Sequence, residues 1–270
     1  MTKIDGKKIA ENILSELEKH PVPKKFLAVF LVGSDAASKS FIAQKERVAK
    51  RLGVDFRVYA YEETITNDVL RERIHQVVDA SKCGGALIQL PLPPHLNGAY
   101  VANAISEKKD VDILSDRARG AFYAKRSTVF PPAVGAFLAV MGAVGKKLED
   151  TSSVAVVGQG FLVGRPISVY CMGQVPRVLA FDKGDDLSVL KGSDVVVLGT
   201  GEKGLIKGSM VADGALVVDF GYGVGSDGVV GGDFDPRGGG DGIVYTPTPG
   251  GTGPILVAKL FENFYQLYNK

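Results

Sequence analysis

The sequence predicts an α/β fold in which most strands are parallel. Apolar runs of four to eight residues alternate with helical patterns through most of the chain, and that alternation is typical of parallel strands joined by helices. With 270 residues, the chain is long enough to bury a full core in one large domain or two modest ones.

In the first half, apolar periodicity and capping residues predict three strands alternating with three helices. The ranges are helix 6–19, strand 26–32, helix 36–51 ended by Gly53, strand 54–60, helix 68–80 and strand 85–89. The last strand must stop at Leu90–Pro94, because proline cannot continue a ladder. Open α/β sheets place ligands at the carboxyl ends of strands, so Gln89 is a candidate site residue.

Phe41 and Lys45 lie four residues apart on the helix 36–51. They therefore share one face and can present an aromatic ring and an amine to the same ligand. On this segment alone, an aromatic residue in the core followed by a solvated lysine is the better explanation.

In the second half, the pattern predicts a connecting helix 133–147, strands 153–157, 178–181, 194–198 and 215–219, and a final helix 255–268. Glycines 158, 160 and 164 follow the first of these strands directly, before Arg165 and a helix. Such a turn suits backbone N–H groups facing a pyrophosphate. The alternative is a packing turn with a solvated Arg165.

Asp182 stands 24 residues after Gly158, at the end of the next predicted strand. An acidic residue there can bind an adenosine ribose and would repel a 2′-phosphate, which favours NAD over NADP. The adjacent Lys183 argues the other way, and a solvated loop aspartate explains the position equally well.

A loop at 245–254 is held by two prolines, while Gly250 and Gly251 allow close backbone approach to a ligand. A plain turn that closes a domain is the alternative reading.

Composition excludes several classes of partner. The net charge is +2, with 32 basic and 30 acidic residues interspersed, so the chain shows no electrostatic signature for nucleic acid or an anionic membrane. The two cysteines and three histidines have no metal-ligand spacing, and we expect no metal site.

The location of the protein is also predicted from the sequence. Residues 1–8 lack the apolar core of a signal peptide, and the uncharged stretch 127–145 is broken by Pro131 and Pro132. The apolar residues that remain after the two prolines are too few to span a bilayer and indicate a buried helix. We expect a cytoplasmic protein with reduced cysteines.

Six segments together resemble the bifunctional methylenetetrahydrofolate dehydrogenase/methenyltetrahydrofolate cyclohydrolase family, over nearly the whole chain. Their order and spacing match the family, with 44 residues between Lys45 and Gln89 and 23 between Gln89 and Asp112. The segments are Ile4–Lys7, Val32–Gly33 through Ser38–Lys45, Gln89–Pro93, Lys109–Asp112, Gly158–Pro166 and Thr246–Gly251.

The resemblance implies two domains flanking a cleft, in a homodimer. Residues 1–131, completed by the C-terminal helix 252–270, would bind folate, and residues 132–251 would form a Rossmann-like domain that binds NADP, the family's usual cofactor, or NAD. It also implies two reactions: 5,10-methylenetetrahydrofolate is oxidised to the methenyl cation, which is then hydrolysed to 10-formyltetrahydrofolate.

The resemblance also assigns roles to residues. The catalytic set would be Lys45, Gln89 and Asp112, with the aspartate binding the pterin. Folate would contact Phe41, Pro91, Pro249, Gly250 and Gly251. The dinucleotide would contact Gly158, Gln159, Gly160, Gly164, Arg165, Asp182 and Lys183.

Several positions depart from the family pattern. Phe41 stands where tyrosine is usual, Ile113-Leu114 replaces Gly-Phe, and Gln159 stands where many members carry arginine. We therefore keep two alternatives to a bifunctional enzyme: a cyclohydrolase with lost or weak dehydrogenase activity, and a non-catalytic protein that binds nucleotide or folate.

Overall fold

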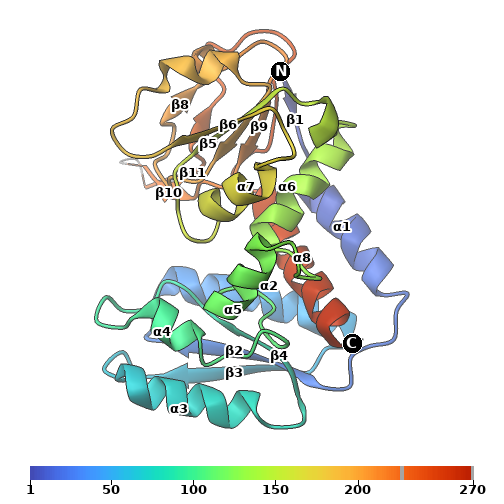
Figure 1. Cartoon of the computed structure of the whole chain (residues 1–270), viewed down its shortest axis with the longest axis vertical. Coiled ribbons are helices and arrows are strands. Elements are labelled where there is room, and N and C mark those ends of the chain that lie inside the picture. The colour runs from blue at the N-terminus through green and yellow to red at the C-terminus, as the bar shows by residue number, and fades with distance from the viewer. Residues whose placement is uncertain (226–227, 269–270) are drawn as a thin grey trace. The chain divides into compact units, whose positions relative to one another are not determined.

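The computed structural model describes residues 1–225 and 228–268 (Figure 1). The chain forms two compact units, one built from residues 1–12 and 133–256 and the other from residues 13–132 and from 257 onward. The first twelve residues thus group with the second half of the chain, because strand β1 (Thr2–Lys3) pairs with β13 (Val244–Tyr245).

The unit around residues 13–132 contains a three-stranded parallel sheet in the order β3-β2-β4. The central strand is buried at every residue, since both of its faces are apolar. The strands are β2 (Phe26–Val32), β3 (Phe56–Tyr61) and β4 (Cys83–Ile88). The helices are α2 (Ala36–Leu52), α3 (Asn67–Val78), α4 (Gly98–Ala102) and α5 (Asp116–Tyr123), while α1 (Gly6–Leu17) and α8 (Thr252–Tyr268) each run through both units.

Helix α2 starts at the predicted residue and ends at Leu52, one residue later than predicted, before the predicted cap Gly53. The Asp35 side chain accepts a hydrogen bond from the Ser38 N–H at 2.7 Å, and Gly53 ends the helix with a φ of 70°. The strand predicted from residue 54 starts at Phe56 instead, because the Val54 N–H is bound to the Ala49 carbonyl of the helix cap.

The other unit contains a six-stranded sheet in the order β1-β13-β9-β7-β5-β6, in which all neighbours are parallel. The chain passes from β5 to β6 on one side and returns to β7 on the other, which creates a topological switch point at β5. The remaining strands of this sheet are β5 (Ser153–Val157), β6 (Arg177–Phe181), β7 (Val195–Leu198) and β9 (Leu216–Asp219).

Helices and short strand pairs complete this unit. They are α6 (Pro132–Ala143), α7 (Gly164–Cys171), a parallel pair of β8 (Ile206–Lys207) with β12 (Phe234–Asp235), and an antiparallel pair of β10 (Gly223–Val224) with β11 (Val230–Gly231). Three 3₁₀ turns occupy Leu148–Asp150, Leu187–Gly192 and Gly208–Met210.

The predicted α/β fold, with a mainly parallel Rossmann-like sheet in its second part, is confirmed. Helix 133–147 was predicted too long: α6 ends at Ala143, because Gly145 takes a φ of 68° and the Lys146 N–H turns back to the Met141 carbonyl. Helix α8 starts at Thr252 rather than at residue 255, and residues 269–270 of the predicted C-terminal segment lie outside the described residues. Over the part of the chain that the structure describes, no helix is both long and apolar enough to span a membrane.

Candidate active site

Two of the three predicted catalytic side chains are in direct contact. Lys45 lies on α2, and Gln89 follows the last residue of β4. The Lys45 Nζ donates a hydrogen bond to the Gln89 Oε1 at 2.9 Å, across 44 residues of sequence. The third residue, Asp112, interacts electrostatically with Lys45. All three belong to the unit around residues 13–132.

Gln89 is fixed at both its backbone and its side chain. Its N–H donates to the Phe30 carbonyl at 2.8 Å and its Nε2 donates to the Leu90 carbonyl at 2.7 Å. With only 6% of its surface exposed, the amide has one orientation available, with its oxygen toward the lysine. The sequence predicted this residue from its place at a strand end.

The segment that carries Asp112 is held by Asp110, a residue that the sequence prediction missed. The buried Asp110 carboxylate accepts hydrogen bonds from the Leu114 N–H at 3.1 Å and the Ser115 N–H at 2.7 Å. Asn263 of α8 adds a second anchor, since its Nδ2 donates to the Val111 carbonyl at 2.9 Å. The proximity of Asp110 to a Ser that could start a helix was the available signal.

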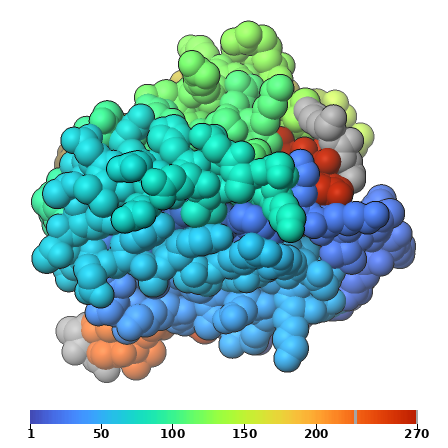
Figure 2. All heavy atoms as spheres, turned by 90° about the horizontal axis from the view of Figure 1, so that it is seen from below, coloured from blue at the N-terminus to red at the C-terminus, as the bar shows by residue number. Residues whose placement is uncertain are grey.

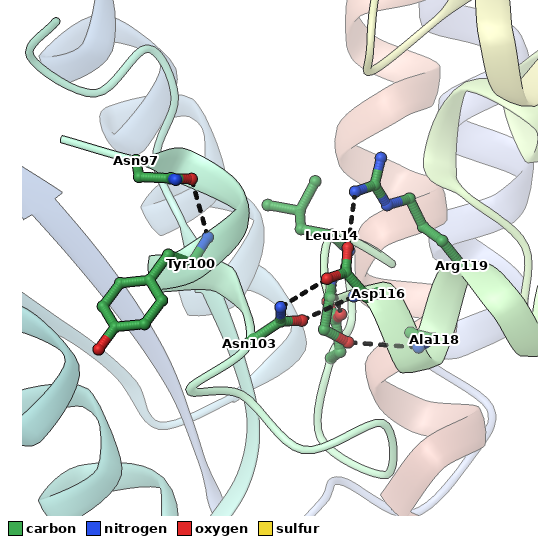
Figure 3. Close-up of polar contacts among 9 residues, drawn as sticks. Asn97, Tyr100, Asn103, Leu114, Asp116, Ala118 and Arg119 are labelled. Atoms are coloured by element: carbon green, nitrogen blue, oxygen red, sulfur yellow. Dashed lines mark hydrogen bonds and ion pairs between the residues drawn. The ribbon is translucent and has the colours of Figure 1, made fainter. Parts of the chain in front are cut away.

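Helix α5 starts directly after this segment and is tied to α4 (Figure 3). Ser115 caps the helix by accepting from the Ala118 N–H at 3.3 Å. Asn103 and Asp116 exchange two hydrogen bonds, from Asn103 Nδ2 at 2.6 Å and to Asn103 Oδ1 at 2.8 Å, and Arg119 pairs with the same carboxylate at 3.2 Å (Figure 3). These contacts fix the position of the turn that holds Asp112.

Burial shifts the pKa values of Lys45 and Asp112 toward each other. Desolvation lowers the pKa of the Lys45 amine, and the charge of Asp112 opposes that shift. Desolvation raises the pKa of Asp112 to about 6, with Lys45 lowering it and Asp110 raising it further. An amine and a carboxyl group in such an environment can move a proton at a pH nearer to neutrality than in water.

We expect the wild type to lose stability relative to an Asp112→Asn variant as the pH rises. The folded-state pKa of Asp112 is about 6 against an ordinary value of 3.8, so the stabilisation is complete below about pH 4 and is lost as the pH rises through 6. The difference should reach on the order of 1–3 kcal/mol. Urea unfolding of both proteins between pH 4 and 8 measures it; parallel curves would contradict the expectation.

Ile113, one of the departures from the family pattern, has a φ of 56°. This left-handed conformation is strained for a β-branched residue and free of strain for glycine. The side chain is nevertheless buried, with 3% exposed. A buried apolar side chain therefore follows Asp112 on a strained backbone.

We expect Ile113→Gly to be more stable than Ile113→Ala by about 1 kcal/mol, which reverses the usual order of these two residues. Both variants lose the buried side chain, so their difference isolates the backbone strain. Chemical denaturation of the pair provides the measurement, and an alanine variant as stable as the glycine variant would rule out strain at this position.

Phe41 and Pro91 flank the catalytic pair in sequence. Phe41 is half-buried on α2, one turn before Lys45, while Pro91 is exposed and follows Gln89 by two residues. The Leu90–Pro91 peptide bond is cis.

The glycine turn after β5 has the geometry of a dinucleotide-binding loop. Gly158 has a φ of 87°, and a Cβ atom on Gly164 would lie 1.8 Å from the Gly158 carbonyl oxygen. Only glycines allow this close approach of strand and helix, which is the feature that lets such a turn receive a pyrophosphate. Gly160 and Arg165 are exposed in the same turn.

The Gln159 side chain is engaged by the protein itself. Its Nε2 donates to the Val156 carbonyl at 2.9 Å and its Oε1 accepts from the Ser168 hydroxyl at 3.1 Å. In this rotamer both polar groups of the side chain are bound to neighbouring residues, and the side chain braces the turn.

Asp182 and Lys183 follow β6, the strand that neighbours β5. Both are exposed. The Asp182 Oδ1 accepts from the Lys183 N–H at 3.0 Å, and the Asp182 N–H donates to Asp185 Oδ2 at 2.7 Å. The Gly158 N–H is bound to the Phe181 carbonyl, so the loop and the acidic residue share one edge of the sheet.

The loop 246–251 packs against the start of the chain. Gly250 has a φ of 94°, and a Cβ on Gly6 would lie 1.8 Å from the Gly251 carbonyl oxygen. The Thr248–Pro249 bond is cis and Pro249 is exposed. The segment Ile4–Lys7 therefore supports this loop, a relation that the sequence alone did not indicate.

Two family models match the chain. The tetrahydrofolate dehydrogenase/cyclohydrolase catalytic domain matches residues 4–112, and the NAD(P)-binding domain of the same enzymes matches residues 131–270. The bifunctional protein FolD of Halothermothrix orenii is 33% identical over 96% of this chain and 95% of its own length. Its counterpart from Francisella philomiragia is 32% identical over 98% of both chains.

Solved structures give the same result. The bifunctional methylenetetrahydrofolate dehydrogenase/cyclohydrolase of Campylobacter jejuni matches with a TM-score of 0.93 and 28% identity, over 100% of this chain and 99% of its own. The enzyme of the same description from Thermoplasma acidophilum matches with a TM-score of 0.87 and 26% identity, over 99% and 98% of the two chains.

Proposed function

The chain belongs to the tetrahydrofolate dehydrogenase/cyclohydrolase family, and from this membership we propose that it catalyses both reactions with the residues described above. The family predicted from the sequence is thereby confirmed. The proposal is that 5,10-methylenetetrahydrofolate is oxidised with NAD(P) and that the methenyl cation is then hydrated to 10-formyltetrahydrofolate.

The contact between Lys45 and Gln89 carries the proposal for hydration. Adding water to a cationic carbon requires an oriented water and a group that moves a proton near neutral pH. We assign the proton transfer to Lys45, whose pKa is lowered by burial. Gln89 orients the amine without adding charge, through the 2.9 Å hydrogen bond. A cationic substrate beside Lys45 would lower its pKa further.

We assign binding of the pterin to Asp112, whose carboxylate can accept two hydrogen bonds from an amino-pyrimidine edge. Phe41 offers a ring that stacks on the folate, and Pro91, Pro249, Gly250 and Gly251 are assigned to the same substrate. The absence of a tyrosine hydroxyl at position 41 leaves the Gln89 amide as the hydrogen-bonding partner that holds Lys45.

For the oxidation, a bound NAD(P) would supply the hydride acceptor. The residues assigned to hold it are Gly158, Gly160, Gly164 and Arg165 of the glycine turn, the backbone of Gln159, and Asp182 with Lys183 at the end of β6. Their task is positioning, since hydride transfer depends on the alignment of donor and acceptor carbons. We place the folate chemistry in the unit 13–132 and dinucleotide binding in the unit 133–256.

An assay of the purified protein tests the dehydrogenase. Methylenetetrahydrofolate is supplied with NADP or with NAD, and formation of NAD(P)H and of methenyltetrahydrofolate is followed by absorbance. Activity with either dinucleotide supports the proposal, and silence with both contradicts it. Disappearance of supplied methenyltetrahydrofolate measures the cyclohydrolase separately.

A cyclohydrolase without an effective dehydrogenase is the second candidate. Its specific support is the Gln159 side chain, which is bound to Val156 and Ser168 and offers no cation to a 2′-phosphate. Equilibrium titration with NAD and NADP separates the two candidates, because a protein of the second kind would bind neither. Asp182 favours NAD over NADP, and Asp182→Ser should reduce that preference if the carboxylate contacts the ribose.

We also propose a cytoplasmic homodimer. The edge strand β3 supports the dimer, since among the described residues only β2 pairs with it. Three of its six residues are exposed, among them Val58 at 41%. Figure 2 shows the blue to cyan surface to which β3 and α3 belong. An exposed strand edge can pair with its copy across a two-fold axis. The buried free thiols of Cys83 and Cys171 suit the cytoplasm.

We expect Val58→Pro to convert the dimer to a monomer. Leu27 and Gly33 of the β2 side donate to the carbonyls of Asp55 and Tyr61, so odd-numbered residues of β3 face β2 and the Val58 N–H points outward. Proline there removes an outward donor and keeps the ladder to β2. Light scattering after gel filtration gives the mass; a monomeric wild type, or a dimeric variant, would contradict the use of this edge.

A further inference from the structure

Two buried aspartates lie near the carboxyl edge of the six-stranded sheet, outside the residues assigned so far. Asp219 is the last residue of β9, with 1% of its surface exposed, and Asp233 precedes β12 with 0% exposed. Burial raises the pKa of both carboxyl groups, and the charge of Asp233 raises the pKa of Asp219 further. Aspartates are rarely buried completely unless their carboxylates are paired or hydrogen-bonded, so the partners of these two decide what they do.

Asp233 holds the loop that follows β7. Its Oδ2 accepts hydrogen bonds from the Thr200 N–H at 2.6 Å and the Gly201 N–H at 3.3 Å. Its Oδ1 has no hydrogen-bond partner among the described residues and lies against Gly221, where an added Cβ would be 2.0 Å away. An unpaired buried oxygen is unfavourable, so fold stability alone does not account for this carboxylate.

Asp219 joins the neighbouring segments. Its Oδ1 accepts from the Gly221 N–H at 2.7 Å and its Oδ2 from the Phe234 N–H at 3.0 Å. Its main-chain carbonyl accepts from the Thr252 hydroxyl at 2.8 Å. Because Phe234 follows Asp233 directly, Asp219 fixes the backbone that presents Asp233 to the loop after β7.

The loop that Asp233 binds, residues 199–201, lies next to the glycine turn that follows β5. Strands β5 and β7 are neighbours at the switch point, and the loops after them border the same crevice. The two loops are in contact, since a Cβ on Gly158 would lie 2.7 Å from the Gly199 carbonyl oxygen. The path of residues 199–201 therefore sets the width of the space beside the glycine turn.

We propose that Asp233 is a positioning residue for the dinucleotide: by binding the Thr200 and Gly201 N–H groups, it holds the loop 199–201 in the path that accepts the cofactor. This role rests on the dehydrogenase function proposed above. It requires no contact between Asp233 and the dinucleotide, in keeping with the complete burial of the side chain.

Asp194, which is exposed and directly precedes β7, provides a control with the same pattern of hydrogen bonds. Its Oδ2 accepts from two consecutive N–H groups at the start of β5, of Ser152 at 2.9 Å and Ser153 at 3.0 Å. Asp233→Ala and Asp194→Ala each leave two N–H groups without their acceptor. Asp233→Asn keeps an acceptor for the loop and serves as the conservative variant.

The experiment titrates NAD and NADP into the wild type and the three variants, with thermal unfolding and cyclohydrolase activity measured on the same samples. Asp233→Ala should weaken dinucleotide binding about tenfold or more, the effect of losing a charged hydrogen-bond acceptor from the site. Asp233→Asn should recover affinity to within about threefold, since its amide oxygen still accepts. Asp194→Ala should bind as the wild type does, and all variants should hydrolyse methenyltetrahydrofolate.

Unchanged affinity in Asp233→Ala would overturn the proposal, as would an equal loss in Asp194→Ala or a parallel loss of cyclohydrolase activity, because either would indicate general destabilisation. If Asp233→Ala does not fold, Asp233→Ser takes its place, because its shorter side chain does not reach both the Thr200 and Gly201 N–H groups. Weakened dinucleotide binding by this variant at an unchanged melting temperature supports the proposal, and wild-type affinity overturns it. A wild type that binds neither dinucleotide would overturn the dehydrogenase function as well, which distinguishes the two failures.

Discussion

Lys45→Met is expected to lower the rate of methenyltetrahydrofolate hydrolysis by about 10²- to 10⁴-fold, the usual contribution of a positioned acid–base group. Methionine has a similar length and no charge, so the fold should be retained: burial already disfavours the charged amine. The substitution also removes the hydrogen bond that the Gln89 Oε1 accepts from Lys45. Decay of methenyltetrahydrofolate absorbance in a weakly buffering medium measures the rate.

Lys50→Met is the matched control for this substitution. Lys50 lies on the same helix, is exposed, and has a different face from Lys45. The control should hydrolyse the substrate at the wild-type rate and unfold at nearly the same urea concentration. Hydrolysis by Lys45→Met at the wild-type rate would remove this lysine from the mechanism.

The elements that were predicted correctly are those whose signal lies within the local sequence. Strands 26–32 and 153–157 match the structure residue for residue, because both are apolar runs that the fold buries completely. Asp35 and Gly53 marked the ends of α2 through capping chemistry. Strands such as β8 and β12 were missed, since each has two residues and forms only through pairing with the other.

The catalytic pair was predicted from family spacing, whereas its surroundings depend on contacts that sequence does not encode locally. A serine that could start a helix follows Asp110, but the local sequence does not show that the Asp110 carboxylate accepts from the Ser115 N–H across the turn. The inward hydrogen bonds of Gln159 depend on the position of Ser168 on α7. Asp233 acts on a loop 32 residues earlier in the chain, through a fold that had to be known first.

Gly164→Ala is expected to abolish dinucleotide binding. The added Cβ would lie 1.8 Å from the Gly158 carbonyl oxygen and 2.9 Å from its carbonyl carbon, and both atoms belong to the backbone of the turn. Because no flexible side chain can move aside, the turn or the start of α7 must shift, at a cost on the order of 2–4 kcal/mol of stability. Dehydrogenase activity should disappear with the affinity for NAD and NADP.

Cyclohydrolase activity should persist in Gly164→Ala at temperatures where the protein remains folded, because Lys45, Gln89 and Asp112 belong to the other unit. Gly142→Ala makes the same chemical change inside α6, where an added Cβ meets no atom within 4 Å. This control should bind dinucleotide normally and gain about 0.5–1 kcal/mol of stability. Dinucleotide titration and chemical denaturation of the two alanine variants show whether the loss is specific to the turn or follows from any glycine-to-alanine substitution in this unit. Normal dinucleotide affinity in Gly164→Ala would show that the turn does not bind the cofactor.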